Sequence, residues 1–302
     1  MRALGTYTLK GHWQAVTVVS VLSLLSLMMP LVGYFGCGVP LALIALRKGG
    51  RFALQVIAGS VVLFLLLSLV LRVPLYFLQG VLLIAWLPVF LCALVHRLTE
   101  RPAMMALAAA ALALLYVLVM YIAVGDVQAW WLEALQSIDV SELPAELQVQ
   151  FEQFVKLAPP VVNAAIASSI VVSLIITLLL ARWWQSALFN PGGFQREFHE
   201  FRIPRQLVLP TLALMGLSLL QAQPFTPVVR ESLVVFVVLY LFHGIAAVHR
   251  TVARRRLSVN WLIAMYCLLF VLPQLMVLMV AWMGLTDSLI GRGLENRQDP
   301  ED

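Results

Sequence analysis

Charged residues are scarce in this chain of 302 residues. Only 12% of the residues are Asp, Glu, Lys or Arg, whereas 62% are hydrophobic and the mean hydropathy is +0.95. An average soluble domain is about a quarter charged, and a soluble fold of this length has too little interior to hide so large an apolar share. The scarcity therefore excludes a water-soluble fold, and the long uncharged runs predict a single polytopic membrane domain.

Cysteine is scarce as well. The three cysteines, Cys37, Cys92 and Cys267, lie far apart in apolar stretches, which excludes a disulfide framework and a CxxC metal site. We expect them to be small buried side chains. No other set of residues indicates a metal or a cofactor, so neither is predicted.

Basic residues outnumber acidic ones, with 20 Lys and Arg against 15 Asp and Glu, and the formal net charge is +5. In a soluble chain this balance would suggest nucleic acid as a partner. Here the basic residues flank apolar runs, so anionic lipid headgroups and insertion topology explain them. The predicted partner is the bilayer, and no nucleic-acid surface is expected.

Apolar runs of the length that a bilayer requires recur along the chain. A hydrocarbon core of about 30 Å needs roughly 20 residues of helix. The candidate spans are Trp13–Met29, Leu31–Leu46, Phe52–Leu71, Pro74–Val95, Ala103–Val124, Pro160–Ala181, Leu207–Leu220, Ser232–Val248 and Asn260–Met283. They predict an all-α transmembrane helix bundle of eight or nine spans. Residues 13–124 hold five spans, 160–181 the sixth and 207–283 the last three, and a polar tail follows over 284–302.

The number of spans depends on residues 11–46, which contain no Lys, Arg, Asp or Glu. A straight helix of that length would exceed the bilayer, and Pro30 and Gly33 offer a break. Nine spans with a cytoplasmic amino terminus place 15 of the 20 Lys and Arg residues inside, whereas eight spans with an outside amino terminus place 13 inside. The positive-inside rule favours nine spans in a bacterial cytoplasmic (inner) membrane, and a re-entrant second segment stays open.

An acidic loop over residues 125–159 is predicted on the outer side. It holds six Asp and Glu residues against the single Lys156. Apolar residues recur in it at helical spacing, namely Leu143, Leu147, Phe151, Phe154 and Val155. This spacing predicts an amphipathic helix that lies on the outer surface or over the bundle. The loop is either a structured connector or a gate or partner surface.

A cytoplasmic segment over residues 182–206 contains the turn sequence Asn190-Pro191-Gly192-Gly193, because Pro fixes φ and glycine permits positive φ. Phe194, Phe198 and Phe201 then follow at i, i+4 and i+7, which predicts a short helix in the inner interface.

A basic cluster, Arg254-Arg255-Arg256, lies between the last two spans. Each of these charges gains about 1 kcal/mol near anionic lipid, so a lipid contact explains the cluster. The alternative is that the turn and this cluster together dock a protein partner.

No Asp, Glu, Lys or Arg lies near the centre of a predicted span, which counts against a carboxylate-based proton antiporter or ion pump. The remaining polar candidates for a substrate-binding role are Gln79, Asn163, His243 and Gln274. Gln274 follows Pro273, which frees a backbone carbonyl, and His243 is followed by Gly244. The alternative for each is an ordinary hydrogen bond between helices.

An enzyme is not predicted. Ser218 and His243 on neighbouring spans superficially resemble an intramembrane serine protease, which needs a serine activated by a histidine base. In that family a glycine follows the serine, whereas Leu219 stands here, and no oxyanion donors are apparent. No nucleophile, base and metal converge elsewhere.

Two motifs carry a family resemblance, Phe189-Asn190-Pro191-Gly192-Gly193-Phe194 and Gly284-Leu285-Thr286-Asp287-Ser288. With the order of spans, they resemble the uncharacterised bacterial YybS-like inner-membrane proteins. That family has no established activity, and it is distantly similar to the substrate-binding S components of energy-coupling-factor vitamin transporters. The six spans of S components match the first six spans here. The chain departs from S components because it lacks their paired docking alanines in the first span and adds three spans.

Two functions are therefore expected as alternatives. The resemblance, the acidic loop and the uncharged polar span interiors favour a small-molecule binding or transport component for an unidentified solute. The cytoplasmic turn and the basic cluster favour a non-enzymatic scaffold or regulatory partner that docks another protein.

Overall fold

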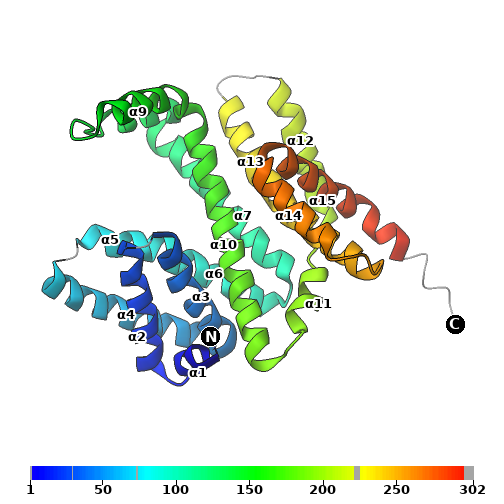
Figure 1. The fold of residues 1–302 in the computed structure, drawn as a ribbon, viewed down its shortest axis with the longest axis horizontal. Helices are drawn as coiled ribbons and strands as arrows, with labels where there is room; N and C mark the ends of the chain where they lie inside the picture. Colours follow the sequence, from blue (N-terminus) through cyan, green and yellow to red (C-terminus); the bar gives the residue numbers. More distant parts are fainter. Residues whose placement is uncertain (1, 29, 73, 221–224, 296–302) are drawn as a thin grey trace. The chain divides into compact units, whose positions relative to one another are not determined.

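The computed structural model describes residues 2–28, 30–72, 74–220 and 225–295. Within these ranges all regular structure is helical, and no strand occurs among the described residues. Figure 1 traces the helices in chain order. The chain divides into two compact units. The first comprises Met1–Ala109, Val172–Arg202 and Ala246–Ile263, and the second comprises Ala110–Val171, Ile203–Ile245 and Ala264–Asp302.

The first unit contains the amino-terminal helices. They are α1 (Arg2–Thr8), α2 (His12–Met28), α3 (Pro30–Lys48), α4 (Gly50–Leu71), α5 (Leu75–Gly80), the π-helix η1 (Val81–Trp86), α6 (Leu87–Thr99) and, later in the chain, α11 (Gly193–His199). α2 packs against α3 and α4, and α3 packs against α6. The predicted break within residues 11–46 is confirmed, because α2 and α3 are separate helices. The predicted boundary residue Met29 lies outside the described residues.

The second unit contains α8 (Val127–Gln136), α9 (Ala145–Leu157), the 3-10 helix η2 (Arg205–Leu207), α12 (Val208–Leu219) and α15 (Pro273–Glu295). Four further helices contribute residues to both units, namely α7 (Pro102–Val124), α10 (Pro159–Phe189), α13 (Thr226–Arg254) and α14 (Asn260–Val271).

Among the residues that the structure describes, six helical segments are long and apolar enough to cross a membrane. They are Gly50–Leu67, Leu75–Thr99, Pro102–Val124, Pro159–Phe189, Thr226–Arg254 and Pro273–Ile290. Three apolar segments are shorter, namely His12–Leu25, Arg205–Leu219 and Asn260–Val271. The protein is thus all-helical with several membrane-capable helices, and the count of eight or nine spans stays a prediction.

The predicted last span, Asn260–Met283, is wrong as a single helix. α14 ends at Val271 and α15 begins at Pro273. Proline has no N–H to donate and its ring clashes with the preceding turn, so the helix breaks there. The 12 residues of α14 extend only about 18 Å, which is too short for a hydrocarbon core of about 30 Å.

α15 packs closely against α13 within the second unit. A Cβ at Gly284 would overlap the Tyr240 carbonyl, and a Cβ at Gly244 would overlap the Val280 carbonyl. The Ser288 hydroxyl lies 3.1 Å from His243 Nδ1. The two helices approach closely because Gly244 and Gly284 have no side chains between them.

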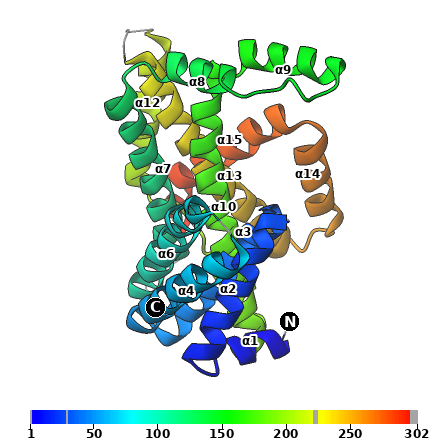
Figure 2. The ribbon, with the colours of Figure 1, turned by 90° about the vertical axis from the view of Figure 1, so that its left-hand side faces the viewer.

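The predicted amphipathic helix of the acidic loop is confirmed as α9. Figure 2 shows α9 running across the end of α10, after α8 and a short connection. On its apolar face Val155 is buried, whereas Leu147 and Phe154 are exposed. This exposed apolar strip suits a helix whose face meets lipid, as in interfacial helices.

Candidate functional site

α13 carries an acidic residue within its first two turns. The helix begins at Thr226-Pro227, where proline loses no hydrogen bond, and Glu231 follows. Glu231 is only 6% exposed. α13 has 29 residues and is about 43 Å long, so a centred hydrocarbon core of about 30 Å begins close to Glu231. A carboxyl group is therefore buried near the edge of a membrane-capable helix.

The end of α7 faces the beginning of α13. Gly125 ends α7 with φ at 72°, a conformation that glycine adopts without steric cost. Asp126 follows and caps α8, because its Oδ1 accepts a hydrogen bond from the Ala129 N–H at 3.0 Å. In the last turn of α7, the Tyr121 hydroxyl donates to Glu231 Oε1 at 2.9 Å.

Asn163 of α10 connects this pair to a wider network. Its Nδ2 donates to Glu231 Oε2, and its Oδ1 accepts from the Tyr116 hydroxyl at 2.8 Å and the Trp131 indole at 3.4 Å. Asn163 is 2% exposed. Burial makes each of these polar groups costly to leave unpaired, so the network fixes α7, α8, α10 and α13 relative to one another at this point.

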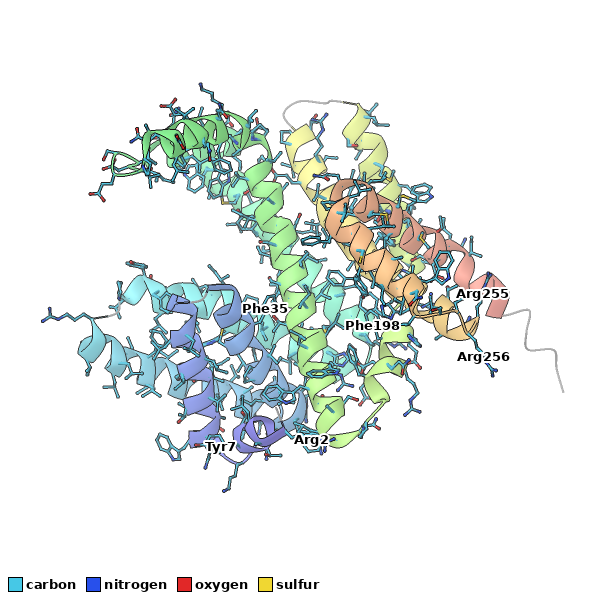
Figure 3. All side chains as sticks on the ribbon, in the orientation of Figure 1. Arg2, Tyr7, Phe35, Phe198, Arg255 and Arg256 are labelled. Atoms are coloured by element: carbon cyan, nitrogen blue, oxygen red, sulfur yellow. The ribbon has the colours of Figure 1, made fainter. Side chains whose placement is uncertain are left out.

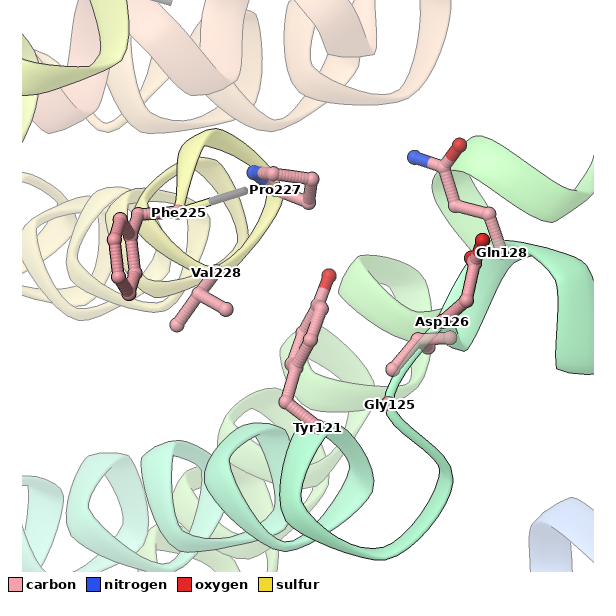
Figure 4. Close-up of a pocket in the computed structure, with 8 residues that line it drawn as sticks. Tyr121, Gly125, Asp126, Gln128, Phe225, Pro227 and Val228 are labelled. Carbon is pink, nitrogen blue, oxygen red and sulfur yellow. The ribbon is translucent and has the colours of Figure 1, made fainter. Parts of the chain in front are cut away.

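A cavity of about 540 Å³ lies between α7, α8 and α13. One wall consists of Tyr121, Gly125, Asp126 and Gln128. The other consists of Phe225, Pro227 and Val228. Figure 4 shows Tyr121 directed into the space between Pro227 and the Asp126–Gln128 segment. We call this cavity the α7–α13 pocket, and Glu231 lies one hydrogen bond behind its wall, through Tyr121.

The charge of Glu231 has no partner within the part of the chain that the structure describes. Its hydrogen-bond partners there are the Tyr121 hydroxyl and the Asn163 amide, both neutral, and no Lys or Arg forms an ion pair with it. Asp126 supplies a second carboxylate in the pocket wall. Among the described residues no group of three or more His, Cys, Asp or Glu is arranged to hold a metal ion.

His243 lies elsewhere in the second unit, fully buried on α13. Its Nε2 lies 2.9 Å from Asp287 Oδ2, and its Nδ1 lies 3.1 Å from the Ser288 hydroxyl and accepts the Ile203 N–H at 3.4 Å. Both ring nitrogens are thus engaged in joining α13, α15 and the Ile203 backbone. Ser218 instead donates to the Met215 carbonyl of its own helix, so the structure does not pair it with His243.

The other two polar candidates are exposed. Gln79 lies on α5 in the first unit, and Gln274 lies in the first turn of α15 in the second unit. Of the four polar candidates, Asn163 is the one that contacts Glu231 behind the pocket.

The predicted turn over residues 190–193 is present in the first unit. Gly192 has φ at 85°, and Gly193 begins α11. The Ser186 hydroxyl fastens this turn, because it donates to the Asn190 carbonyl at 2.6 Å and accepts from the Phe194 N–H at 3.0 Å. Asn190 and Pro191 are exposed. The turn is therefore held to the end of α10.

Glu197 anchors α11 to two other helices of the first unit. It pairs with Arg182 of α10 and lies 3.1 Å from the His96 Nε2 of α6. Burial favours the neutral carboxyl, but the hydrogen bonds from His96 and Arg182, with their charge, outweigh burial and hold the Glu197 pKa below its ordinary value. α11 is thus a bound element of the fold.

The basic cluster follows α13. Arg254, Arg255 and Arg256 are all exposed. Figure 3 marks Arg255 and Arg256 at this turn, where Arg256 has φ at 50° and the helix has ended. Three exposed guanidinium groups in sequence suit contact with anionic headgroups.

Sequence reasoning missed Glu231, Tyr121 and Asp126. The predicted span began at Ser232, one residue after Glu231, whereas α13 begins at Thr226. The Thr226-Pro227 pair is a helix-start signal that would have placed Glu231 inside the helix. Nothing in the sequence pattern pairs Tyr121 with Glu231, because they are 110 residues apart.

The comparisons with known proteins identify one family. A family model described as "Predicted membrane protein (DUF2232)" matches residues 16–288. Neither the curated proteins nor the solved structures contain a significant match to the chain.

Proposed function

The chain belongs to the DUF2232 family of predicted membrane proteins, and from this premise we propose that it is a small-molecule binding or transport component whose solute site is the α7–α13 pocket. The observation that carries the proposal is a cavity of about 540 Å³ beside the buried carboxyl of Glu231. Cavities of about 300 to 1,000 Å³ with a few polar groups are typical of small-molecule sites. Ionisable residues inside membrane helices commonly mark solute or ion pathways.

The pocket lies on the outer side in this proposal. α13 carries the pocket at its beginning and Arg254 at its end, and the positive-inside rule assigns the arginines to the cytoplasm. The membrane is the bacterial cytoplasmic membrane, with a cytoplasmic amino terminus. The resemblance to energy-coupling-factor S components supports the same class of function, since those proteins bind solutes from outside.

A thermal-shift screen of bacterial metabolites tests the proposal. Val228→Trp fills the pocket from α13, and Val234→Trp is the matched control, because Val234 lies on the same helix, is exposed and does not line the pocket. We expect a compound that raises the unfolding midpoint of the wild type and of the control, with no rise for Val228→Trp. Equal rises in all three proteins would refute the pocket as the solute site.

A second candidate function is a scaffold that docks a protein partner through the Asn190–Gly193 turn and the Arg254–Arg256 cluster. The exposure of the three arginines favours it. Deletion of residues 190–202 should then abolish cross-linking to the partner while membrane insertion is retained. Cross-linking that survives the deletion would contradict this candidate.

A further inference from the structure

The α7–α13 pocket is surrounded by more negative than positive charge. Two helices begin at it, α8 and α13, and each helix start contributes about half a positive charge. Asp126 caps α8 and Glu231 lies in the second turn of α13, so each start is offset by a full carboxylate. α7 ends at the pocket, and its free carbonyls add about half a negative charge.

The nearest cationic residue along α13 is Arg230. It precedes Glu231, is exposed and does not line the pocket. Solvent screens its field more strongly than it screens the field of a buried carboxylate. The field inside the pocket is therefore negative.

Glu231 itself requires a counter-charge. A buried carboxylate with neutral partners is costly, and either a proton or a cation relieves that cost. The Tyr121 hydroxyl donates to Glu231 at 2.9 Å while its ring lines the pocket. A cation in the pocket thus lies one side chain away from Glu231.

The pocket walls favour an organic cation over a metal ion. Phe225, Pro227 and Val228 present apolar surface, and Asp126 is the one carboxylate among the lining residues. A divalent metal prefers six or more oxygen ligands, which this wall does not offer. The Phe225 and Tyr121 rings can face an ammonium group, as aromatic rings do in sites for organic cations.

We infer that the α7–α13 pocket selects small organic cations, such as amines with an apolar body, through the charges of Asp126 and Glu231. This inference rests on the proposed function and adds the chemical class of the solute.

Charged thiol reagents test the selectivity without knowledge of the solute. Val228→Cys places a thiol in the pocket wall, in a Cys267→Ser background that retains the buried Cys37 and Cys92. Two methanethiosulfonates of similar size are compared, one with a trimethylammonium group and one with a sulfonate group. The measured quantity is the reaction rate of the cationic reagent divided by that of the anionic reagent. This ratio is then divided by the same ratio measured with 2-mercaptoethanol.

We expect this normalised ratio to be about tenfold in favour of the cationic reagent, because a unit charge about 5 Å away in water changes each rate by a few fold in opposite directions. Asp126→Asn and Glu231→Gln should each lower the ratio about threefold. The glutamine keeps both hydrogen bonds if its oxygen accepts from Asn163 and its nitrogen donates to Tyr121. Glu142→Gln is the matched control, since Glu142 is exposed and does not line the pocket.

The outcomes separate this inference from the proposed function. A ratio near one, with both reagents reacting readily, overturns the inference of cation selectivity and leaves an accessible pocket. The proposed function itself is contradicted if neither Val228→Cys nor Gln128→Cys, on the opposite wall, reacts faster than the Cys267→Ser background variant. A raised ratio that neither Asp126→Asn nor Glu231→Gln lowers refutes the assignment of the selectivity to these two carboxylates.

Discussion

At the scale of single residues, Asn163 determines the geometry behind the pocket. It uses both ends of its amide, as a donor to Glu231 and as an acceptor from Tyr116 and Trp131. A single amide thereby satisfies an acid on α13 and two aromatic residues on α7 and α8. The contribution of such a residue exceeds that of a typical hydrogen bond between membrane helices, because its loss strands several buried polar groups at once.

Asn163→Leu should therefore destabilise the protein by about 1 to 2 kcal/mol. The leucine has similar volume but removes the partner of the Tyr116 hydroxyl and one of the two hydrogen bonds of the Glu231 carboxyl. The measurement is the unfolding midpoint in detergent. Ser169→Ala is the control, since the Ser169 hydroxyl bonds only to the Ile166 carbonyl of its own helix among the described contacts. Equal midpoints for the two variants would contradict the network.

At the scale of elements, the contact of α13 with α15 depends on two glycines. A Cβ at Gly244 would overlap the Val280 carbonyl, and a Cβ at Gly284 would overlap the Tyr240 carbonyl. The obstacle in both cases is backbone, which cannot turn aside as a side chain can. The close approach also brings His243 to Asp287 and Ser288.

Gly244→Ala should lower the unfolding midpoint clearly, because α13 and α15 must separate to admit the methyl group. We expect a loss of about 1 to 3 kcal/mol, as in overpacked cores. Gly216→Ala on α12 is the matched control. A Cβ at Gly216 meets nothing within 4 Å, so alanine should stabilise that helix by up to about 1 kcal/mol. A loss of similar size in both variants would refute the glycine contact.

The attachment of α11 should depend on pH. The ordinary pKa of Glu197 is 4.5, and folding lowers it. At pH values between the folded pKa and 4.5, the unfolded chain therefore binds more protons than the folded chain. The stabilisation by the Glu197 carboxylate is therefore full above 4.5 and is lost as pH falls through the lower, folded pKa.

Glu197→Gln tests this pH dependence. The difference in the free energy of unfolding between wild type and Glu197→Gln should be largest at neutral pH, at about 1 to 2 kcal/mol. It should narrow below pH 4.5. Glu200→Gln is the control, since Glu200 lies on the next turn and is exposed. A difference that stays constant on acidification would show that the carboxylate charge contributes nothing.

The elements also show what sequence can and cannot predict. Helical periodicity and uncharged length are local properties, so α7, the beginning of α10 and the amphipathic α9 were predictable, whereas α10 continues beyond the predicted Ala181 to Phe189. The break at Pro273 was visible as a proline, yet the hydropathy of Asn260–Met283 outweighed it.

The sequence prediction missed Glu231 because its neighbours on both sides are polar or charged, which moved the predicted start of the span. The network of Asn163 with Glu231 joins residues 68 positions apart, and periodicity carries no information on such pairs.

At the scale of the whole molecule, the number of full spans determines on which side of the membrane the carboxyl terminus lies. α14 is too short to cross the hydrocarbon core and is followed directly by α15 at Pro273, so we expect the two helices to form a re-entrant pair in place of the predicted last span. Nine full spans would place the carboxyl terminus outside, whereas the re-entrant pair places it inside. An inside tail also raises the number of cytoplasmic Lys and Arg residues from 15 to 17 of 20, by adding Arg292 and Arg297.

A cysteine added at the carboxyl terminus of a Cys267→Ser variant should therefore be protected from a membrane-impermeant maleimide in intact cells. It should react once the membrane is permeabilised. Val228→Cys gives the opposite pattern in the same experiment, because the proposed pocket opens outside. Labelling of the terminal cysteine in intact cells would contradict the re-entrant pair of α14 and α15.

The central claim is that the α7–α13 pocket holds a small molecule, and native mass spectrometry of protein extracted gently from its own membrane tests it most directly. The wild type and Val234→Trp should carry a stoichiometric adduct of a few hundred daltons, a mass typical of ligands for a pocket of this size, and Val228→Trp should lack it. The same adduct on all three proteins, or none on any of them, would contradict the claim.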